Sequence, residues 1–462
     1  MNETTREREG LTVLLARRAA QTRTQLLAAD VRLLVRQSLL DYLGVSIAGA
    51  REKQARMVAD EMIAQSGRAD AGMLGRGVRL PAMAASLANG TAAHALDFDD
   101  VNMAIPGHPA AVIFPAALAV AEELDAGGAA LAEAYVAGYD TMCSLGLAMG
   151  VEHYDAGFHA TATLGCIGAA AACGRLYALP PDVMAHALGL AAAQAAGLKS
   201  MFGTMTKPLN AGRAAATGVL AAKLARRGFE SRVDAVESEQ GMAALMAARI
   251  RPEQATAREP GDFLRQNLFK RHVACYLTHA AIESARELRE RHGLALPRIA
   301  AVIVRADRSL DGVCNIADPR DSMSAKFSLK AATALALLGR DTGAPAAFEA
   351  FATDDETTAL AKRVTVSLQA GWPKNICEVE LRMTNGATDV ARWDSAVADS
   401  DLERQGTVLR RKFDGLTVPL LGRRNADRLA GLVDDLERLD GIAAMSAIAC
   451  GINEVEHERA QD

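Results

Sequence analysis

The chain has 462 residues, half of them apolar, and its 51 basic and 56 acidic residues give a formal net charge of -5 at pH 7. A chain of this length can bury two substantial cores, so we expect two domains. The weak acidic balance argues against nucleic acid or an anionic membrane as the main partner, and a small anionic substrate would need a local basic pocket.

Targeting and membrane signals are the next features to consider. Met1–Gly10 is charged and has no apolar core before a small-residue cleavage site, which argues against a secretory signal. The most apolar run, residues 110–121, is too short to cross a membrane and contains Pro115. The seven cysteines are scattered and form no C-x-x-C pair, which fits neither a disulfide framework nor a zinc site. These features predict a soluble protein of the reducing cytoplasm.

The first half of the chain has a helical pattern. From Leu26 to about Ala248, apolar residues recur at the spacing of one helix face, so we expect helices throughout. Runs of small residues, such as Gly165–Gly174, let helix axes approach closely. These segments predict the core of an all-α domain.

The composition changes after Pro260. Ile299–Arg305 and Arg363–Leu368 are rich in β-branched residues, and Cys377–Met383 alternates apolar with polar residues, which predicts three strands. Ala325–Leu338 is expected to be helical between them. The sequence therefore predicts a separate α+β domain over residues 266–400.

The last segment, Asp401–Gly451, is again typical of a helix. Its apolar positions need a partner face, and they are Leu429, Leu432, Val433 and Leu436. Such a tail most simply rejoins the first domain. We therefore expect a mainly α protein, in which a large helical domain over residues 1–265 is completed by residues 401–462 and interrupted by the smaller α+β domain.

Several familiar catalytic motifs are absent. There is no G-x-G-x-x-G or G-x-x-x-x-G-K-[ST] motif, and the glycines of Gly72–Gly77 have the wrong spacing for a phosphate-binding loop. Neither G-x-S-x-G nor H-E-x-x-H occurs. Nucleotide-dependent enzymes, serine hydrolases and zinc proteases are therefore disfavoured.

The most informative motif is an acidic cluster followed by a turn and a histidine. Asp97, Asp99 and Asp100 precede the Pro-Gly-His-Pro turn at residues 106–109, which contains His108. Such a turn between two helices can aim Asp97 and His108 into one cleft, where a carboxylate and an imidazole form an acid/base pair. The alternative is that Asp99 and Asp100 cap helices and that His108 is a buried structural histidine.

Two further segments place one polar side chain among small or apolar ones. His159 stands near the start of a small-residue helix, whose dipole could favour a neutral imidazole or bind an anion. A buried structural histidine is the alternative. Lys207 precedes Pro208 among methionine, phenylalanine and leucine residues. It is either a surface lysine with a buried stem or a cation that binds a substrate carboxylate.

A fourth segment, Leu268–His279, lies at the predicted domain junction. It gathers Lys270, Arg271, His272, Cys275 and His279 within twelve residues. A solvated basic face would explain the cations, and packing would explain Cys275, because no catalytic thiol motif surrounds it. The two histidines are too far apart for an i, i+4 metal pair, so we predict no metal site.

Taken together, these segments resemble the MmgE/PrpD family, whose members include 2-methylcitrate dehydratase, cis-aconitate decarboxylase and iminodisuccinate epimerase. The resemblance covers almost the whole chain, and several dispersed segments in the right order are more specific than any one of them. The segments that carry it are HALDFDD (His94–Asp100), GHPAAVIFPAALA (Gly107–Ala119), GFHATATLG (Gly157–Gly165), KSMFGTMTKPLNAGRAA (Lys199–Ala215), KRHVACYLTH (Lys270–His279) and MSAKFSL (Met323–Leu329).

The resemblance implies a large helical domain interrupted by an α+β lid, a homodimer, and an active-site cleft between the two domains without a metal or organic cofactor. It assigns Asp97 and His108 to acid/base positions that line the cleft. It likewise assigns His159 to a second histidine, and Lys207 and Lys270 to two lysines.

Two positions depart from the family pattern. Asn210 follows the Lys-Pro pair at a place where the family pattern has a histidine. Val101 replaces a hydroxyl residue found in decarboxylase-like members. These departures leave the particular reaction open. Asn210, His272 and Cys275 complete the predicted substrate-binding residues.

We expect Lys207 and Lys270 to hold substrate carboxylates, while His108 or His159 exchanges the proton on the adjacent carbon and Asp97 orients His108 or carries the proton itself. Removing that proton places negative charge on the neighbouring carboxylate. Such charge is tolerable only where ammonium groups and preorganised donors meet it in a water-poor site.

The sequence thus predicts a cofactor-independent lyase, either a dehydratase or a decarboxylase, that acts on a small di- or tricarboxylic acid. The alternative is an epimerase of a dicarboxylic acid such as iminodisuccinate, because two histidines and Lys207 could supply both faces of one carbon. A non-catalytic protein that binds a carboxylate metabolite is the remaining class, and it predicts no turnover.

Overall fold

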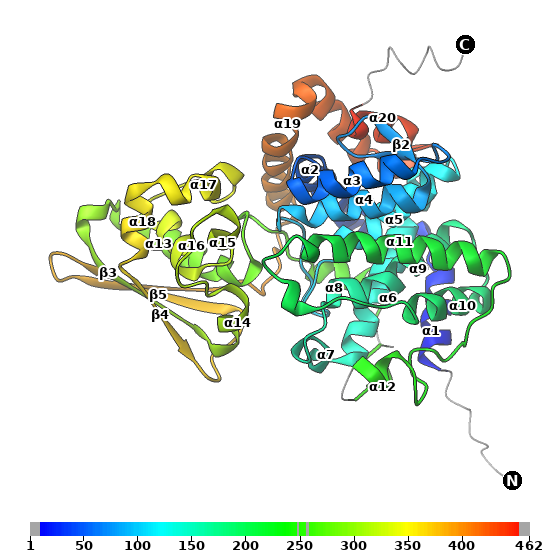
Figure 1. Cartoon of the computed structure of the whole chain (residues 1–462), viewed down its shortest axis with the longest axis horizontal. Helices are drawn as coiled ribbons and strands as arrows, with labels where there is room; N and C mark the ends of the chain where they lie inside the picture. Colours follow the sequence, from blue (N-terminus) through cyan, green and yellow to red (C-terminus); the bar gives the residue numbers. More distant parts are fainter. Residues whose placement is uncertain (1–9, 247–248, 256–257, 452–462) are drawn as a thin grey trace, which may run out of the picture.

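The computed structural model describes residues 10–246, 249–255 and 258–451, and Figure 1 shows two bodies that stand side by side. Each body has its own cluster of buried apolar side chains. The expectation for Met1–Gly10 lies outside the described residues except for Gly10. The segment at residues 253–260, just before the predicted α+β domain, is described only in part.

The larger body is built of helices, as the apolar spacing predicts. They are α1 Leu11–Gln21, α2 Ala29–Gly49, α3 Lys53–Gln65, α4 Ala82–Ala95, α5 Ala110–Glu123, α6 Gly128–Met149, α7 Val151–Asp155, α8 Ala160–Thr163, α9 Gly165–Leu176, α10 Pro181–Ala192, α11 Thr206–Arg226 and α12 Met242–Met246. One part of the prediction was wrong, because this region also contains an antiparallel hairpin of β1 Ala71–Met73 and β2 Val78–Leu80. Gly75 and Gly77 adopt positive φ in its turn, a conformation that glycine reaches at no steric cost.

Small residues bring the central helices together, as predicted. A Cβ atom on Gly138 of α6 would lie 2.6 Å from the carbonyl oxygen of Gly168 in α9, and one on Gly90 of α4 would lie 2.8 Å from the Cα atom of Gly212 in α11. Larger side chains would force these helix pairs apart. Residues 110–121 of α5 are buried along their whole length. Within the described chain, no helix combines the length and the apolar character of a membrane span.

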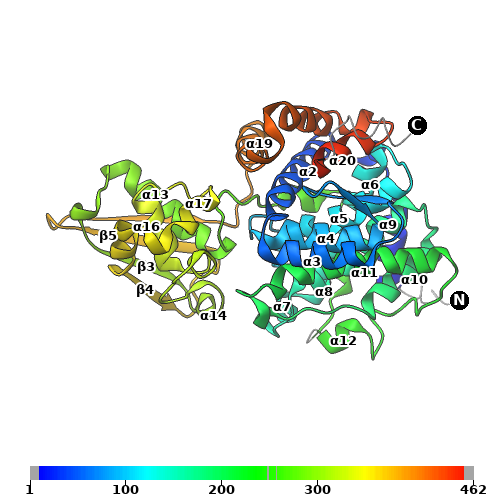
Figure 2. The same ribbon diagram turned by 45° about the horizontal axis from the view of Figure 1, so that its top comes forward.

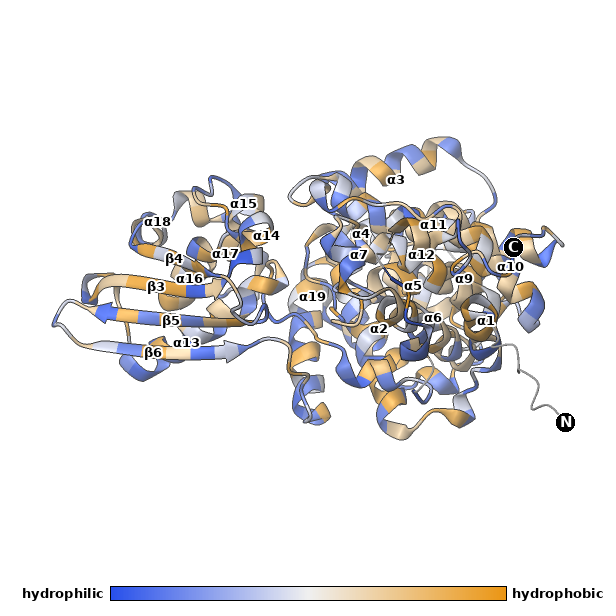
Figure 3. Cartoon of the chain, turned by 90° about the horizontal axis from the view of Figure 1, so that it is seen from below, coloured by the Kyte–Doolittle hydropathy of each residue, from blue (hydrophilic) through white to orange (hydrophobic). Residues whose placement is uncertain are grey.

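The smaller body contains a four-stranded sheet with the order β4-β3-β5-β6, which Figure 3 shows side by side. β3 and β4 are parallel, whereas β3–β5 and β5–β6 are antiparallel. Its elements are α13 His279–His292, β3 Ile299–Asp307, α14 Asp311–Cys314, α15 Ser322–Lys326, α16 Leu329–Leu337, α17 Pro345–Glu349, α18 Asp355–Ala361, β4 Val364–Gln369, β5 Ile376–Met383 and β6 Thr388–Asp394.

The three predicted strands and the helix between them are confirmed, although that helix is divided into α15 and α16. Buried Val302 and Val304 lie on one face of β3, and α13 and α16 pack against the sheet. On the other face Arg305 pairs with Glu378 at 2.8 Å. The sequence pattern missed β6, because Ala391 is the only buried residue along that strand.

The C-terminal segment returns to the larger body. α19 Leu402–Asp434, which breaks at Gly422, lies beside α2 in Figure 2, and α20 Ala443–Cys450 follows it. The four apolar positions of the tail, Leu429, Leu432, Val433 and Leu436, pack in the core of the larger body as predicted. The mainly α fold with a smaller α+β body is therefore confirmed, and the boundaries at residues 266 and 400 remain our proposed division.

Candidate active site

A cavity of about 370 Å³ is lined by residues of both bodies. The helical body contributes Asp97, His108, His159 and Lys207, together with apolar residues such as Val101. The α+β body contributes Cys275, Tyr276, Phe327 and Lys374. This volume suits a small organic ligand. The smaller body therefore covers the cavity as a lid.

The acidic loop between α4 and α5 forms one wall of the cavity. Val101 and Leu268 exchange two backbone hydrogen bonds of 2.8 Å, which fasten this loop to the chain that enters the lid. Asp97 adopts a φ of 55°, a left-handed conformation that is uncommon for a residue other than glycine. Backbone strain of this kind persists where surrounding contacts enforce it, and it is often found at functional sites.

Two lysines enclose Asp97. Lys207 Nζ lies 2.6 Å and Lys270 Nζ 3.0 Å from the same carboxylate oxygen, and Lys270 also donates to the Asp97 carbonyl at 2.6 Å. Burial opposes ionisation of Asp97, but the two ammonium groups hold its pKa well below the usual range. Burial disfavours the Lys207 cation, but the Asp97 carboxylate raises the pKa of Lys207. The carboxylate is thus shared between two cations, and this group of three side chains carries one excess positive charge.

The position of Lys207 excludes one of the two interpretations of that residue. Its side chain is buried and is not a surface lysine. The ammonium lies 5.2 Å from the centre of the Phe202 ring and 5.3 Å from that of Phe327, so aromatic faces from both bodies flank it. In such a water-poor setting a cation attracts a carboxylate far more strongly than it does in water.

The hydrogen bonds of His108 fix its tautomer. Its Nδ1 atom lies 2.7 Å from the carbonyl oxygen of Asp100 and 3.4 Å from a carboxylate oxygen of Asp99. A carbonyl oxygen only accepts hydrogen bonds, so Nδ1 carries the proton and Nε2 carries the lone pair. Burial holds the pKa of His108 well below its usual value. The ring is therefore neutral near pH 7, with a basic nitrogen available.

His159 has the opposite tautomer. The amide Nδ2 of Asn210 lies 3.4 Å from His159 Nδ1, and an amide nitrogen can only donate. The proton of the neutral ring therefore resides on Nε2, which has no hydrogen-bond partner among the described residues. Burial holds the pKa of His159 well below its usual value. The cavity thus contains one neutral imidazole that can accept a proton and one that can donate a hydrogen bond.

His94 is a third buried histidine that the sequence did not single out as a site residue. Its Nδ1 atom lies 2.8 Å from Asp99, and its ring centre lies 4.6 Å from that of His108 and 5.7 Å from that of His159. Asp99 thus orients two histidines. Asp100 accepts a hydrogen bond of 3.1 Å from the backbone N–H of Ala110 at the start of α5, as the capping alternative predicted.

His94, Asp99 and His108 are the described residues whose ligand atoms lie close enough together to hold a metal ion. However, the nitrogens that lie next to Asp99 are the Nδ1 atoms of the two histidines, and both already donate hydrogen bonds to oxygen atoms. A nitrogen that carries a proton has no lone pair for a metal. The donor set therefore fits a hydrogen-bond network better than a metal centre.

Cys275 lies on the lid side of the cavity. Its backbone N–H donates to the Lys326 carbonyl at 3.0 Å, which fixes the loop before α13. A hydrogen bond from the buried Cys314 thiol lowers the pKa of Cys275 against the opposing effect of burial, and the charge of Lys207 contributes. All seven cysteines are free, as expected from their spacing.

Three predicted site residues do not line this cavity within the described structure. Lys270 lies behind Asp97, and Asn210 lies behind His159. The ring of His272 is held between Glu283 at 2.9 Å and Thr342 at 2.9 Å, inside the lid. Asn210 and His272 were expected to bind substrate directly, but their polar atoms form hydrogen bonds with neighbouring side chains. Asp97, His108, His159, Lys207 and Cys275 all line this one cavity.

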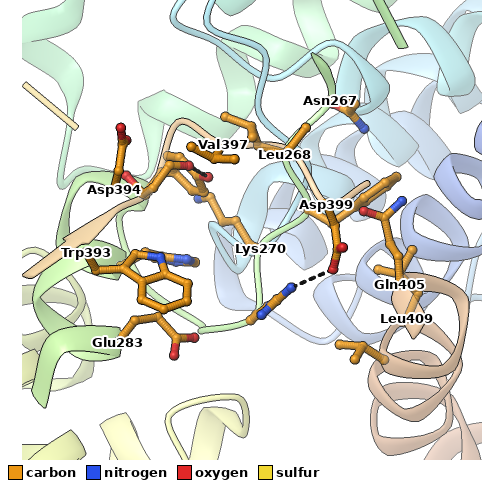
Figure 4. Close-up of a pocket in the computed structure, with 17 residues that line it drawn as sticks. Asn267, Leu268, Lys270, Glu283, Trp393, Asp394, Val397, Asp399, Gln405 and Leu409 are labelled. Atoms are coloured by element: carbon orange, nitrogen blue, oxygen red, sulfur yellow. Dashed lines mark hydrogen bonds and ion pairs between the residues drawn. The ribbon is translucent and has the colours of Figure 1, made fainter. Parts of the chain in front are cut away.

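Lys270 instead lines a smaller hollow of about 90 Å³ between the two chain connections that join the bodies (Figure 4). One connection contains Asn267 and Leu268, and the other contains Val397 and Asp399. Arg271 pairs with Asp399 at 3.0 Å and links them. Lys270 thus connects this junction to Asp97.

Lys412 of α19 is another residue that the sequence did not single out. Its Nζ atom lies 2.6 Å from buried Asp41, 2.6 Å from the Phe98 carbonyl and 3.1 Å from the Lys270 carbonyl. The C-terminal tail thereby ties the acidic loop to the entry of the lid. Neither Lys412 nor Asp41 lies in a recognisable motif, so no sequence signal identified this contact.

Comparisons with known proteins match two family domains along the chain. A model of the MmgE/PrpD N-terminal domain matches residues 13–255, and a model of the MmgE/PrpD C-terminal domain matches residues 272–438. The cis-aconitate decarboxylase of Homo sapiens is 25% identical over 445 residues, which cover 90% of this chain and 89% of that protein.

Fungal relatives match a shorter stretch. The cis-aconitate decarboxylase of Aspergillus terreus is 27% identical over 306 residues, which cover 63% of this chain and 62% of that protein. A cis-aconitate decarboxylase-like protein of Aspergillus oryzae is 27% identical over 281 residues, which cover 57% of this chain and 58% of that protein. The chain therefore matches about three fifths of the length of these fungal relatives.

Proposed function

The chain belongs to the MmgE/PrpD family, and we propose that it is a lyase that acts on a small di- or tricarboxylic acid without a metal or organic cofactor. The similarity to cis-aconitate decarboxylases favours loss of carbon dioxide over loss of water. The observation that carries the proposal is a neutral His108 in the same cavity as the buried Lys207 ammonium.

In the proposed reaction, Lys207 binds the carboxylate next to the reacting carbon. Loss of carbon dioxide breaks a carbon–carbon bond and leaves its electron pair on the substrate, where it spreads onto that carboxylate. Lys207 and the Nε2 proton of His159 stabilise the developing negative charge. Lys270 acts through Asp97, because it holds the carboxylate that orients Lys207.

His108 carries the proton. The binding of an anionic acid raises its pKa, so that Nε2 takes up a proton from water and gives it to the substrate carbon. The ring ends neutral, as it began. In a dehydration the same nitrogen would instead remove a proton from carbon, and a second acid would protonate the departing hydroxyl group.

An epimerase of a dicarboxylic acid is the second candidate. One observation favours it: proton carriers lie on both bodies, with His108 on the helical side and the Cys275 thiol on the lid side. Epimerisation needs one such group on each face of the same carbon. This mechanism predicts inversion without loss of atoms.

A product screen tests the proposal. The protein is incubated in heavy water with cis-aconitate, citrate, 2-methylcitrate and iminodisuccinate, and proton NMR distinguishes loss of carbon dioxide, loss of water and inversion. His108→Gln should lower turnover by roughly 100-fold or more. His186→Gln is the control, because His186 lies on α10 and bonds to the Ser231 carbonyl. No turnover and no deuterium uptake by the unmodified protein would leave only carboxylate binding.

The proposal further includes a homodimer located in the cytoplasm, with neither nucleic acid nor a membrane as partner. Seven free cysteines support a reducing compartment. The family resemblance supports the dimer, which sedimentation analysis would test.

A further inference from the structure

The cavity contains two additional lysines, one from each body. Lys199 begins the short 3-10 turn Lys199–Met201 of the helical body, and Lys374 lies between β4 and β5 of the lid. Both line the cavity. Burial lowers the pKa of Lys199; the charge of Asp155 opposes this effect, and the charge of Lys374 adds to it. Two ammonium groups that repel each other thus face the same space.

These cations are only partly neutralised. Lys374 Nζ lies 3.5 Å from an oxygen of Asp155, and both side chains of this pair are about half exposed. Lys199 Nζ donates to the Tyr154 carbonyl at 3.2 Å and lies 3.9 Å from the centre of the Tyr154 ring. Two ammonium groups therefore share one acidic side chain, which leaves an excess positive charge.

This pair is separate from the charges around Asp97. The side chain of Lys207 contacts Asp97 and two phenylalanine rings, whereas Lys199 and Lys374 contact Tyr154 and Asp155. Among the described residues, these contacts of the two sets of ammonium groups involve different residues, yet both sets line one cavity. A ligand with two or more carboxylates could therefore reach both sets at once.

We propose that Lys199 and Lys374 form a second carboxylate subsite, which binds the substrate carboxylate farthest from the reacting carbon. The orientation of the ligand rests on the proposed function, since the reacting end lies at His108 and Lys207. A carboxylate has two oxygens and can accept a hydrogen bond from each ammonium group. The subsite therefore selects di- and tricarboxylic acids over monocarboxylic acids.

The subsite has two physical consequences. Because its lysines belong to different bodies, a bound carboxylate ties the lid to the helical body. Asp155 competes with the ligand for Lys374, so its negative charge weakens binding of the distal carboxylate. Removing a lysine and removing this aspartate should therefore change affinity in opposite directions.

Calorimetric titration tests the subsite without requiring turnover. The ligands are propane-1,2,3-tricarboxylate and butyrate, and the variants are Lys199→Met, Lys374→Met and Asp155→Asn. Each lysine variant should bind the tricarboxylate about tenfold more weakly, as expected for loss of a charge-assisted hydrogen bond at a partly exposed site, and should bind butyrate unchanged. Asp155→Asn should bind the tricarboxylate a few-fold more tightly. Lys362→Met, which removes an exposed lysine of the lid after α18, is the matched control and should change neither affinity.

Three results would overturn the subsite: no tricarboxylate binding by the unmodified protein, equal losses for both ligands in the lysine variants, or weaker tricarboxylate binding in Asp155→Asn. The expected affinities combined with no turnover of any acid would support the subsite and refute the lyase. The two proposals can therefore fail independently.

Discussion

Neutralising Asp97 should destabilise the protein, because two buried ammonium groups pair with its carboxylate. In Asp97→Asn the side chain keeps its shape, and asparagine tolerates the positive φ of this position, so the charge is the main change. Lys207 and Lys270, now 2.6 Å and 3.0 Å from a neutral amide, would be left buried without a counter-charge. Breaking a buried ion pair in this way costs about 3–5 kcal/mol.

For a protein of this size, that loss corresponds to a fall in Tm of roughly 6–10 °C, at about 2 °C per kcal/mol. Thermal and urea unfolding measure it. Adding Lys207→Met to Asp97→Asn removes one of the two unpaired buried cations and should restore about 1–3 kcal/mol of the free energy of unfolding. Asp60→Asn is the control, because the Asp60–Arg76 pair is exposed and should contribute less than about 1 kcal/mol. An unchanged Tm in Asp97→Asn, or no recovery in the double variant, would refute the account of the shared carboxylate.

Three further predictions concern other parts of the network. Burial holds the pKa values of His94, His108 and His159 well below 6.5, so the unfolded chain binds more protons than the folded one at pH 5–6. The free energy of unfolding should therefore fall as the pH drops below about 6.5, by up to about 1.4 kcal/mol per pH unit for each such ring. Urea unfolding at constant ionic strength measures this, and a free energy of unfolding that does not change with pH would contradict the prediction. Lys412→Met should lower the free energy of unfolding by about 3–5 kcal/mol, because it leaves Asp41 buried without a counter-charge. Hydrogen exchange should also accelerate at residues 97–101, since Lys412 holds the Phe98 carbonyl. Unaltered exchange there would exclude the anchoring role. Dialysis against a chelator should leave turnover unchanged, and activity restored only by an added divalent cation would show that the histidine network is a metal centre.

The sequence alone predicted most of the helices and strands. Apolar spacing marked the helices, β-branched runs marked β3 and β4, and the alternation of apolar and polar residues marked β5. The apolar positions of the tail indicated its return to the helical body. These patterns are local, because a helix or strand repeats its buried face every few residues. The hairpin of β1 and β2 and the exposed strand β6 were not predicted, because neither has a long apolar repeat.

The sequence also identified five residues that line the cavity, but it did not give most of their roles. An acidic cluster followed by a turn marked Asp97 and His108, and an apolar setting marked Lys207. Nothing local distinguished Lys199 or Lys374 from surface lysines. Asn210 and His272 lie in informative segments, yet their side chains serve a neighbouring histidine and a glutamate of the lid. A motif gives the residue type and not the direction in which its side chain points.

Tertiary structure alone decided the electrostatics of the site. Asp97 meets Lys207 and Lys270 across 110 and 173 residues of chain, and Lys412 reaches the Phe98 carbonyl across 314. The tautomers of His108 and His159 likewise depend on acceptors and donors that packing supplies. Such contacts have no sequence period, because they arise only when helices from distant segments bury one another and bring their polar groups together away from water.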